Sequence, residues 1–226
     1  MDITAVLNTY SALMSDIKER HRLLTRLLVN PGNLPGWAVV ELSQLQVRMI
    51  CEVFAIACLV AHGDVEGTRT GRLVKAYQAD LIINALENLH PWFYPRPSKQ
   101  VAKVTGPAKF DLVPITDQFL TKEELINAYR SSYDFLHAGT LKKLVLDQKP
   151  RTLVDPKPTA EWARKLVTLL NHHHISLIDP PGEPIAMGTD GVPVPKRQII
   201  VIMQSANNGQ PQASLFERLG RVPDDV

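Results

Sequence analysis

Residues 121–140 read TKEELINAYRSSYDFLHAGT, and this stretch carries complete signals for one amphipathic helix. Thr121 and Glu124 form a capping box, in which each side chain can hydrogen-bond the other residue's backbone amide. Ala138 and Gly139 provide the stop, since glycine readily adopts the left-handed conformation that closes a helix. Apolar residues at three- and four-residue spacing form one stripe: Leu125, Ile126, Tyr129, Tyr133 and Leu136. The stretch therefore predicts a helix that packs by one face against other helices.

Arg130 and His137 lie side by side along the edge of this stripe. Two helical turns separate them, about 10 Å along the axis. Arginine offers a fixed fork of donors for phosphate oxygens, and histidine can move a proton near neutral pH. The pair is therefore a candidate for metal-free RNA cleavage. The alternative is structural: Arg130 pairs with Asp134 or Glu52, and His137 bonds a backbone carbonyl near the helix end.

Composition sets broad limits on the rest of the chain. With 226 residues, 45% hydrophobic and 21% charged, the sequence is typical of a globular protein with one substantial core. A net charge of +2 does not by itself indicate nucleic acid or membrane. The longest apolar run, 49–61, is too short to span a bilayer, and acids interrupt the first segment where a signal peptide would be apolar. We expect a cytoplasmic protein without membrane contact, in which Cys51 and Cys58 stay reduced.

Three further helices are predicted before residue 90, at 2–29, 35–62, and from Thr68 or Thr70 to 89. Short connections between them favour antiparallel neighbours. The second is apolar nearly all round from residue 49, which is typical of a central buried helix. Arg48 and Glu52 share one face of it. They form either a structural ion pair or a support for the candidate site, and both interpretations remain open.

Residues 90–120 contain five prolines and no sustained periodicity, which predicts a long loop with a functional or covering role. Aromatic residues open this segment and basic residues follow them. Together they could stack on bases and contact phosphates of a single RNA strand. The candidates for this role are Trp92, Tyr94, Arg96, Lys99 and Lys103. The alternative is that the aromatic residues anchor the loop on the bundle and the basic ones are solvated.

A polar connector at 142–158 suggests a boundary between a helical domain, 1–150, and a C-terminal segment, 157–226. This segment is predicted to contain a helix from Thr159 to His174, followed by strands at 175–178, 184–187 and 198–203 in an antiparallel meander. A further turn at 207–209 and a frayed acidic C-terminus complete it. The run from His172 to His174 is not expected to bind a metal. Consecutive helical residues diverge by about 100° and no further ligand stands at a suitable spacing. We expect neither metal nor cofactor.

The octapeptide RSSYDFLH at 130–137 resembles the Arg-x4–6-His signature of the HEPN superfamily, helical domains common in prokaryotic toxin–antitoxin, phage-defence and CRISPR-linked ribonucleases. Tyr129 before the arginine and Ala138-Gly139 after the histidine also resemble that family's last core helix. The resemblance covers about residues 1–150. It implies a bundle of four to five helices, a homodimer with facing motifs, and metal-independent RNA cleavage that leaves 2′,3′-cyclic phosphate ends.

The expected fold is therefore mainly α, a HEPN-like antiparallel bundle with a small C-terminal α+β segment that contains an antiparallel meander. The expected function is that of a defence or toxin–antitoxin endoribonuclease. Arg130 and His137 are its candidate catalytic residues, supported by Arg48, Glu52, Tyr133 and Asp134. The alternative is a non-catalytic HEPN-fold module that acts through dimerisation, a protein partner or an antitoxin.

Overall fold

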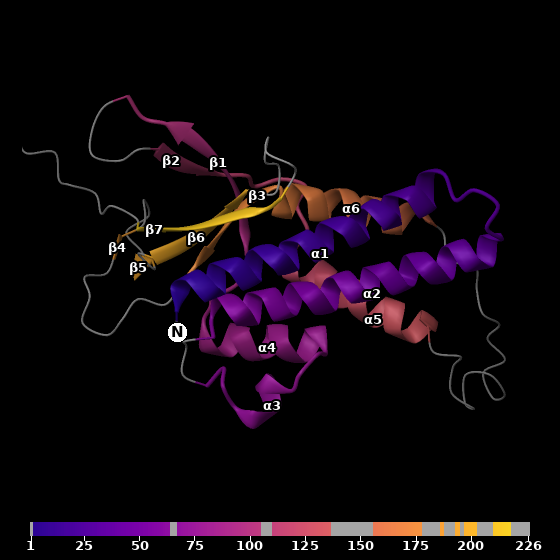
Figure 1. Ribbon diagram of the computed structural model, residues 1–226, viewed down its shortest axis with the longest axis horizontal. Coiled ribbons are helices and arrows are strands. Elements are labelled where there is room, and N and C mark those ends of the chain that lie inside the picture. Colours follow the sequence, from indigo (N-terminus) through magenta and orange to yellow (C-terminus); the bar gives the residue numbers. More distant parts are fainter. Residues whose placement is uncertain are drawn as a thin grey trace, which may run out of the picture.

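The computed structural model describes residues 2–63, 67–104, 110–136, 156–177, 186–187, 193–194, 197–202 and 210–217. Within these ranges long helices form a bundle, and a five-stranded antiparallel sheet lies beside the N-terminal half of the first helix (Figure 1). The prediction of a mainly helical protein with a small antiparallel sheet is confirmed.

Helices α1 (Ile3–Val29) and α2 (Gly36–Ala61) form a long antiparallel hairpin (Figure 1). Asp2 caps α1, because its carboxylate accepts a hydrogen bond of 2.9 Å from the Thr4 amide. Gly32 in the connection has a φ of 65°, a conformation that glycine adopts without steric cost. Both helices match their predicted ranges closely, since each carries a long apolar periodicity and a Pro/Gly-containing break.

Helix α2 is the centre of the core, as its apolar sequence predicts. It packs against α1, α4 and α5, and six of its residues are fully buried: Ile50, Cys51, Phe54, Ala55, Ala57 and Cys58. By length and composition alone α2 could also cross a membrane, but 61% of its apolar window is buried inside the protein. A buried core helix has the same length and composition, so these features alone do not indicate a membrane span.

The helix predicted from Thr68 or Thr70 to residue 89 is wrong in its first half. The structure has a single turn, α3 (Gly71–Val74), and a separate helix, α4 (Ala79–Leu89). Val74, at the end of α3, and Tyr77, before α4, are 67% and 57% exposed, so neither belongs to a buried face of a continuous helix. Burial of Ile82, Ile83 and Leu86 against α2 sets the phase of α4 instead.

Helix α5 (Lys122–Leu136) begins as its sequence predicts. The Glu124 amide donates to Thr121 Oγ1 at 3.2 Å, and the Thr121 amide donates to Glu124 Oε2 at 3.0 Å. The capping box is therefore complete. Leu125, Ile126 and Tyr129 are buried, and this face packs on α2 and α4.

The long loop predicted at 90–120 is only partly a loop. It contains β1 (Arg96–Ala102) and β2 (Phe110–Pro114), paired antiparallel from Ser98 opposite Pro114 to Ala102 opposite Phe110. Pro97 and Pro114 lie near strand ends, and β2 is an edge strand, so their missing N–H groups are tolerated. The prediction failed because β1 is held by β3, a strand far away in sequence.

The C-terminal helix is also shifted from its predicted range. Helix α6 spans Pro156–Leu170, and the histidines expected at its end instead belong to β3 (His172–Ser176). Thr159, the predicted first residue of this helix, lies inside α6, where its buried hydroxyl accepts a hydrogen bond of 3.3 Å from Gln44 Nε2 on α2. Strand β3 forms because its backbone pairs on both edges, with β1 and with β6.

The main sheet has the order β2-β1-β3-β6-β7, with every neighbouring pair antiparallel. Strand β6 (Arg197–Ile202) agrees with prediction, whereas β7 (Gln212–Glu217), which follows the predicted turn at 207–209, was not predicted. The predicted strand at 184–187 is β4 (Ala186–Met187), which pairs with β5 (Pro193–Val194) in a separate two-stranded sheet. Strands β1 and β2 precede the connector at 142–158 where the domain boundary was predicted, and β3, β6 and β7 follow it. One sheet thus combines strands from both sides of this connector.

Candidate functional site

Arg130 lies on the solvent side of α5 and reaches the first turn of α4. Its Nε and Nη2 atoms lie 3.3 and 3.4 Å from Oδ2 of Asp80. The Arg130 side chain is 58% exposed and that of Asp80 is 30% exposed. An ion pair this open to water contributes at most about 1 kcal/mol. The guanidinium is therefore oriented by α4 yet remains accessible to an anion.

His137 follows directly after Leu136, the last described residue of α5, and lies outside the described residues, as does the Asp134 side chain. The pairing of Arg130 with His137 stays a prediction. Glu52, one of the two acids expected to pair with Arg130, pairs with Arg48. The sequence did not identify Asp80 as the partner of Arg130. Asp80 is suited to the first turn of a helix, where acidic residues are common, and no periodicity relates it to Arg130.

Behind Arg130, a polar cluster joins α2 to α5. Arg48 Nε donates to Glu52 Oε1 at 3.0 Å, and these side chains are only 20% and 12% exposed. The Tyr129 hydroxyl lies 3.5 Å from the same Glu52 oxygen. The Arg48 guanidinium lies 5.1 Å from the centre of the Tyr133 ring, a cation–π distance. The structural interpretation of Arg48 and Glu52 thus has a physical basis: Glu52 is the carboxylate around which the cluster is built.

Tyr129 is held in its protonated form by this environment. Burial raises the pKa of its hydroxyl to about 12, the Glu52 and Asp80 carboxylates add to the rise, and Arg48 partly opposes it. At neutral pH Tyr129 is therefore a hydrogen-bond donor and not a general base. The surface therefore offers one oriented cation, Arg130, next to the Arg48–Glu52–Tyr129 cluster. A group that transfers a proton has to come from outside this cluster.

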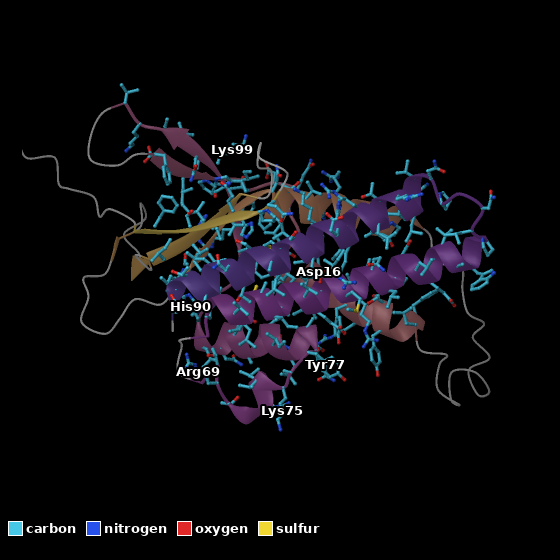
Figure 2. The ribbon with its side chains drawn as sticks, in the orientation of Figure 1. Asp16, Arg69, Lys75, Tyr77, His90 and Lys99 are labelled. Carbon is cyan, nitrogen blue, oxygen red and sulfur yellow. The ribbon has the colours of Figure 1, made fainter. Side chains whose placement is uncertain are left out.

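The predicted RNA-contacting residues lie elsewhere. Arg96 and Lys99 are exposed on β1, and Lys103 pairs with Asp111 of β2 at 3.1 Å. Figure 2 shows Lys99 on the hairpin, well separated from Tyr77, which lies just before the start of α4. Because Arg130 reaches Asp80 in the first turn of α4, the hairpin and Arg130 are separate surfaces.

The aromatic residues at the start of this segment contact the core. Phe93 is 1% exposed. The Tyr94 ring lies 5.4 Å from the Phe54 ring, and its hydroxyl donates to the Leu120 carbonyl at 3.1 Å. Trp92 is half-buried against the His90 ring, 5.9 Å away. These contacts favour the anchoring alternative over base stacking.

The three consecutive histidines form part of the sheet. His173 is buried, and its Nδ1 donates to the Leu170 carbonyl at 2.9 Å. Burial lowers its pKa to about 3. His172 and His174 each place Nδ1 at 3.3 Å from the Ser98 hydroxyl. Among the described residues, no group of three possible metal ligands gathers here or elsewhere.

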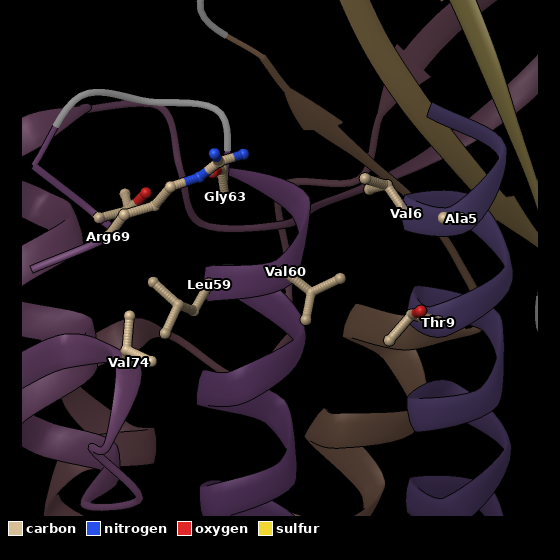
Figure 3. Close-up of a pocket in the computed structure, with 9 residues that line it drawn as sticks. Ala5, Val6, Thr9, Leu59, Val60, Gly63, Arg69 and Val74 are labelled. Carbon is tan, nitrogen blue, oxygen red and sulfur yellow. The ribbon is translucent and has the colours of Figure 1, made fainter. Parts of the chain in front are cut away.

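A hollow of about 320 Å³ lies between the start of α1 and the end of α2. Figure 3 shows the residues that line it. Its walls are mainly apolar, and Arg69 stands at its rim with Nε donating to the Gly63 carbonyl at 2.7 Å. None of the predicted site residues lines it. The candidate site is therefore the surface around Arg130 and not this hollow.

Comparisons with protein-family models, curated proteins and solved structures found no match for this sequence.

Proposed function

We propose that this chain is a HEPN-like endoribonuclease of a defence or toxin–antitoxin system, which cleaves RNA without a metal ion through Arg130 and His137. The main support for the proposal is the exposed Arg130 guanidinium on α5 of a helical bundle. A weak ion pair with Asp80 orients this guanidinium and can be replaced by another anion. An incoming phosphate can displace the carboxylate because both groups are open to water.

In the proposed reaction, the 2′-oxygen of a ribose attacks the adjacent phosphorus while His137 accepts the hydroxyl proton. Arg130 stabilises the added negative charge on the phosphorane oxygens. The bond from phosphorus to the 5′-oxygen then breaks, and an imidazolium returns a proton to that oxygen. The products are a 2′,3′-cyclic phosphate and a 5′-hydroxyl, with no change in oxidation state.

A homodimer fits this chemistry. Two helical turns separate Arg130 from His137 in sequence, about 10 Å along a helix axis. One phosphate can then contact both residues only if the arginine is extended or if a second copy supplies the missing group. Tyr133, next to this region on α5, is 45% exposed and offers an aromatic surface for such a contact.

The test is incubation of purified full-length chain with labelled single-stranded RNA in EDTA. We expect cleavage with cyclic phosphate ends, identified by mass spectrometry. Arg130→Ala and His137→Ala should each reduce the rate by at least about a hundredfold, the usual scale for loss of charge stabilisation or acid–base catalysis. Arg164→Ala is the matched control, because Arg164 is an exposed arginine on α6 that bonds Gln118 and lies outside the cluster.

Loss of the weak Arg130–Asp80 pair should leave the fold intact, so folding can be verified by thermal unfolding of each variant. Cleavage at the wild-type rate by both Arg130→Ala and His137→Ala would contradict the proposal.

A second candidate function is that of a non-catalytic HEPN-like module acting through dimerisation or a protein partner. It is favoured by the exposed apolar side chains on the first half of α2, namely Leu34 just before the helix, Trp37, Leu42 and Leu45. It predicts no RNA cleavage, and a change of particle mass in light scattering when Trp37 is replaced by Ser. Unchanged mass in that variant would count against it.

A further inference from the structure

A second hollow lies between α1 and α6, separate from Arg130 on α5 and from its partner on α4. Its volume is about 200 Å³. The floor is apolar and consists of Ile17, Leu166 and Leu170, which are 1%, 1% and 2% exposed. A cavity of about 150 Å³ holds a benzene molecule. The hollow is therefore large enough for one aromatic ring or a short aliphatic chain that carries a small head group.

The rim of this hollow is cationic on the α1 side. Lys18 and Arg22 stand one helical turn apart and both line it. Among the described residues that line it, none is acidic. Arg22 forms an ion pair of 2.5 Å with Glu19, but the two side chains are 58% and 64% exposed, so a bound anion can replace this partner.

His21 fixes the distance between the two walls. Its Nε2 lies 3.1 Å from the Ala163 carbonyl of α6, and a carbonyl only accepts, so this nitrogen carries the proton. The ring is half-buried, and burial lowers its pKa. The neutral imidazole joins α1 to α6 and so restrains the spacing of the two helices at the hollow. A site whose walls are joined in this way has a smaller ordering cost on binding.

We propose that this hollow between α1 and α6 binds a small organic anion, with its apolar part on Ile17, Leu166 and Leu170 and its carboxylate or phosphate at Lys18 and Arg22. Apolar floor and cationic rim together select an amphiphilic anion over either a neutral ring or an inorganic ion. A bidentate contact with the Arg22 guanidinium is available to both head groups. The site does not depend on the proposed ribonuclease activity.

The experiment is calorimetric titration of the full chain with four probes: benzoate, phenyl phosphate, benzyl alcohol and inorganic phosphate. We expect benzoate or phenyl phosphate to bind at least about tenfold more tightly than the last two, equivalent to about 1.4 kcal/mol. The tighter of the two aromatic anions identifies the head group. Equal affinity for all four probes, or no binding of either aromatic anion, would overturn the proposal.

Variants locate the binding. Val167 lines the hollow and is 41% exposed, so Val167→Trp should fill the space and abolish binding while the fold is retained. Arg22→Gln should weaken binding by about tenfold. Arg26→Gln is the matched control, because Arg26 lies one turn further along α1, is exposed and does not line the hollow. Anion binding that survives Val167→Trp, or that Arg26→Gln weakens as much as Arg22→Gln, would show that the anion binds elsewhere.

Discussion

Tyr10 and His173 stand 163 residues apart and are hydrogen-bonded at 2.9 Å inside the core, which joins the first helix to the middle strand of the sheet. The Leu170 carbonyl faces His173 Nδ1, and a carbonyl can only accept, so Nδ1 carries the proton. Nε2 must then accept a hydrogen bond from the Tyr10 hydroxyl. Both ring nitrogens are satisfied only while the imidazole is neutral.

Tyr10→Phe removes the donor and leaves a buried nitrogen without a partner. We expect the free energy of unfolding to fall by about 1–3 kcal/mol, the usual cost of an unsatisfied buried polar group. Urea unfolding measures the change. Tyr77→Phe is the control, since Tyr77 is 57% exposed and its loss should cost less than about 0.5 kcal/mol. Equal effects of the two substitutions would contradict the assigned hydrogen bond.

His173 also predicts a loss of stability in mild acid. Its pKa is about 3 in the folded protein against 6.5 for the free group, so below pH 6.5 the unfolded chain binds a proton that the folded chain excludes. The free energy of unfolding is therefore not reduced by this group above pH 6.5. It falls as pH drops from 6.5 toward 3, by up to about 1.4 kcal/mol per pH unit.

Urea unfolding at a series of pH values tests this slope. His173→Gln removes the ionisable group, so its stability should depend less steeply on pH, although lowered pKa values at His21 and His172 act in the same direction. A variant slope as steep as that of the wild type would show that another group controls the acid sensitivity.

Glu52 is the acceptor on which the α2–α5 cluster depends. Glu52→Gln removes the charge that compensates Arg48, and because both side chains are largely buried we expect a loss of about 1–3 kcal/mol in stability. Glu19→Gln breaks the exposed ion pair with Arg22 and should cost less than about 1 kcal/mol. Thermal unfolding compares the two. A smaller effect at Glu52 than at Glu19 would rule out a central role for the buried carboxylate.

Asp80 should restrain Arg130 rather than stabilise the fold. A double-mutant cycle of Asp80→Asn and Arg130→Gln should give a coupling energy below about 1 kcal/mol, because the pair is exposed. If Arg130 binds the scissile phosphate, Asp80→Asn frees it, and kcat/KM for RNA should rise by roughly fivefold, equivalent to about 1 kcal/mol. A fall in kcat/KM on this substitution would mean that Asp80 itself takes part in the reaction.

Helices were predictable where their signals are local. The apolar periodicity of α1 and α2, and the reciprocal Thr121–Glu124 cap of α5, act within a few residues of the chain. The Arg48–Glu52 pair was found for the same reason, since it joins successive turns of one helix. Asp80 was missed as the partner of Arg130, because these residues meet only after α4 and α5 have packed together.

Strands were less predictable because their stability comes from distant partners. Residues 172–174 continue a helical sequence without a stop signal, yet they pair with β1 on one edge and β6 on the other. In a strand, successive side chains point to opposite faces of the sheet. His173 accordingly faces Tyr10 in the core, while His172 and His174 both approach Ser98. Strands β1 and β7 were hidden by prolines and by a polar composition typical of loops.

The shared sheet constrains any attempt to shorten the protein. A chain cut after α5 would retain β1 and β2 but lose β3, the strand that covers the other edge of β1. The hairpin would then present unpaired amide and carbonyl groups at a new open edge, a surface that promotes association between strands of different molecules. The isolated helical part should therefore aggregate more readily than the whole chain, in which β3 covers this edge.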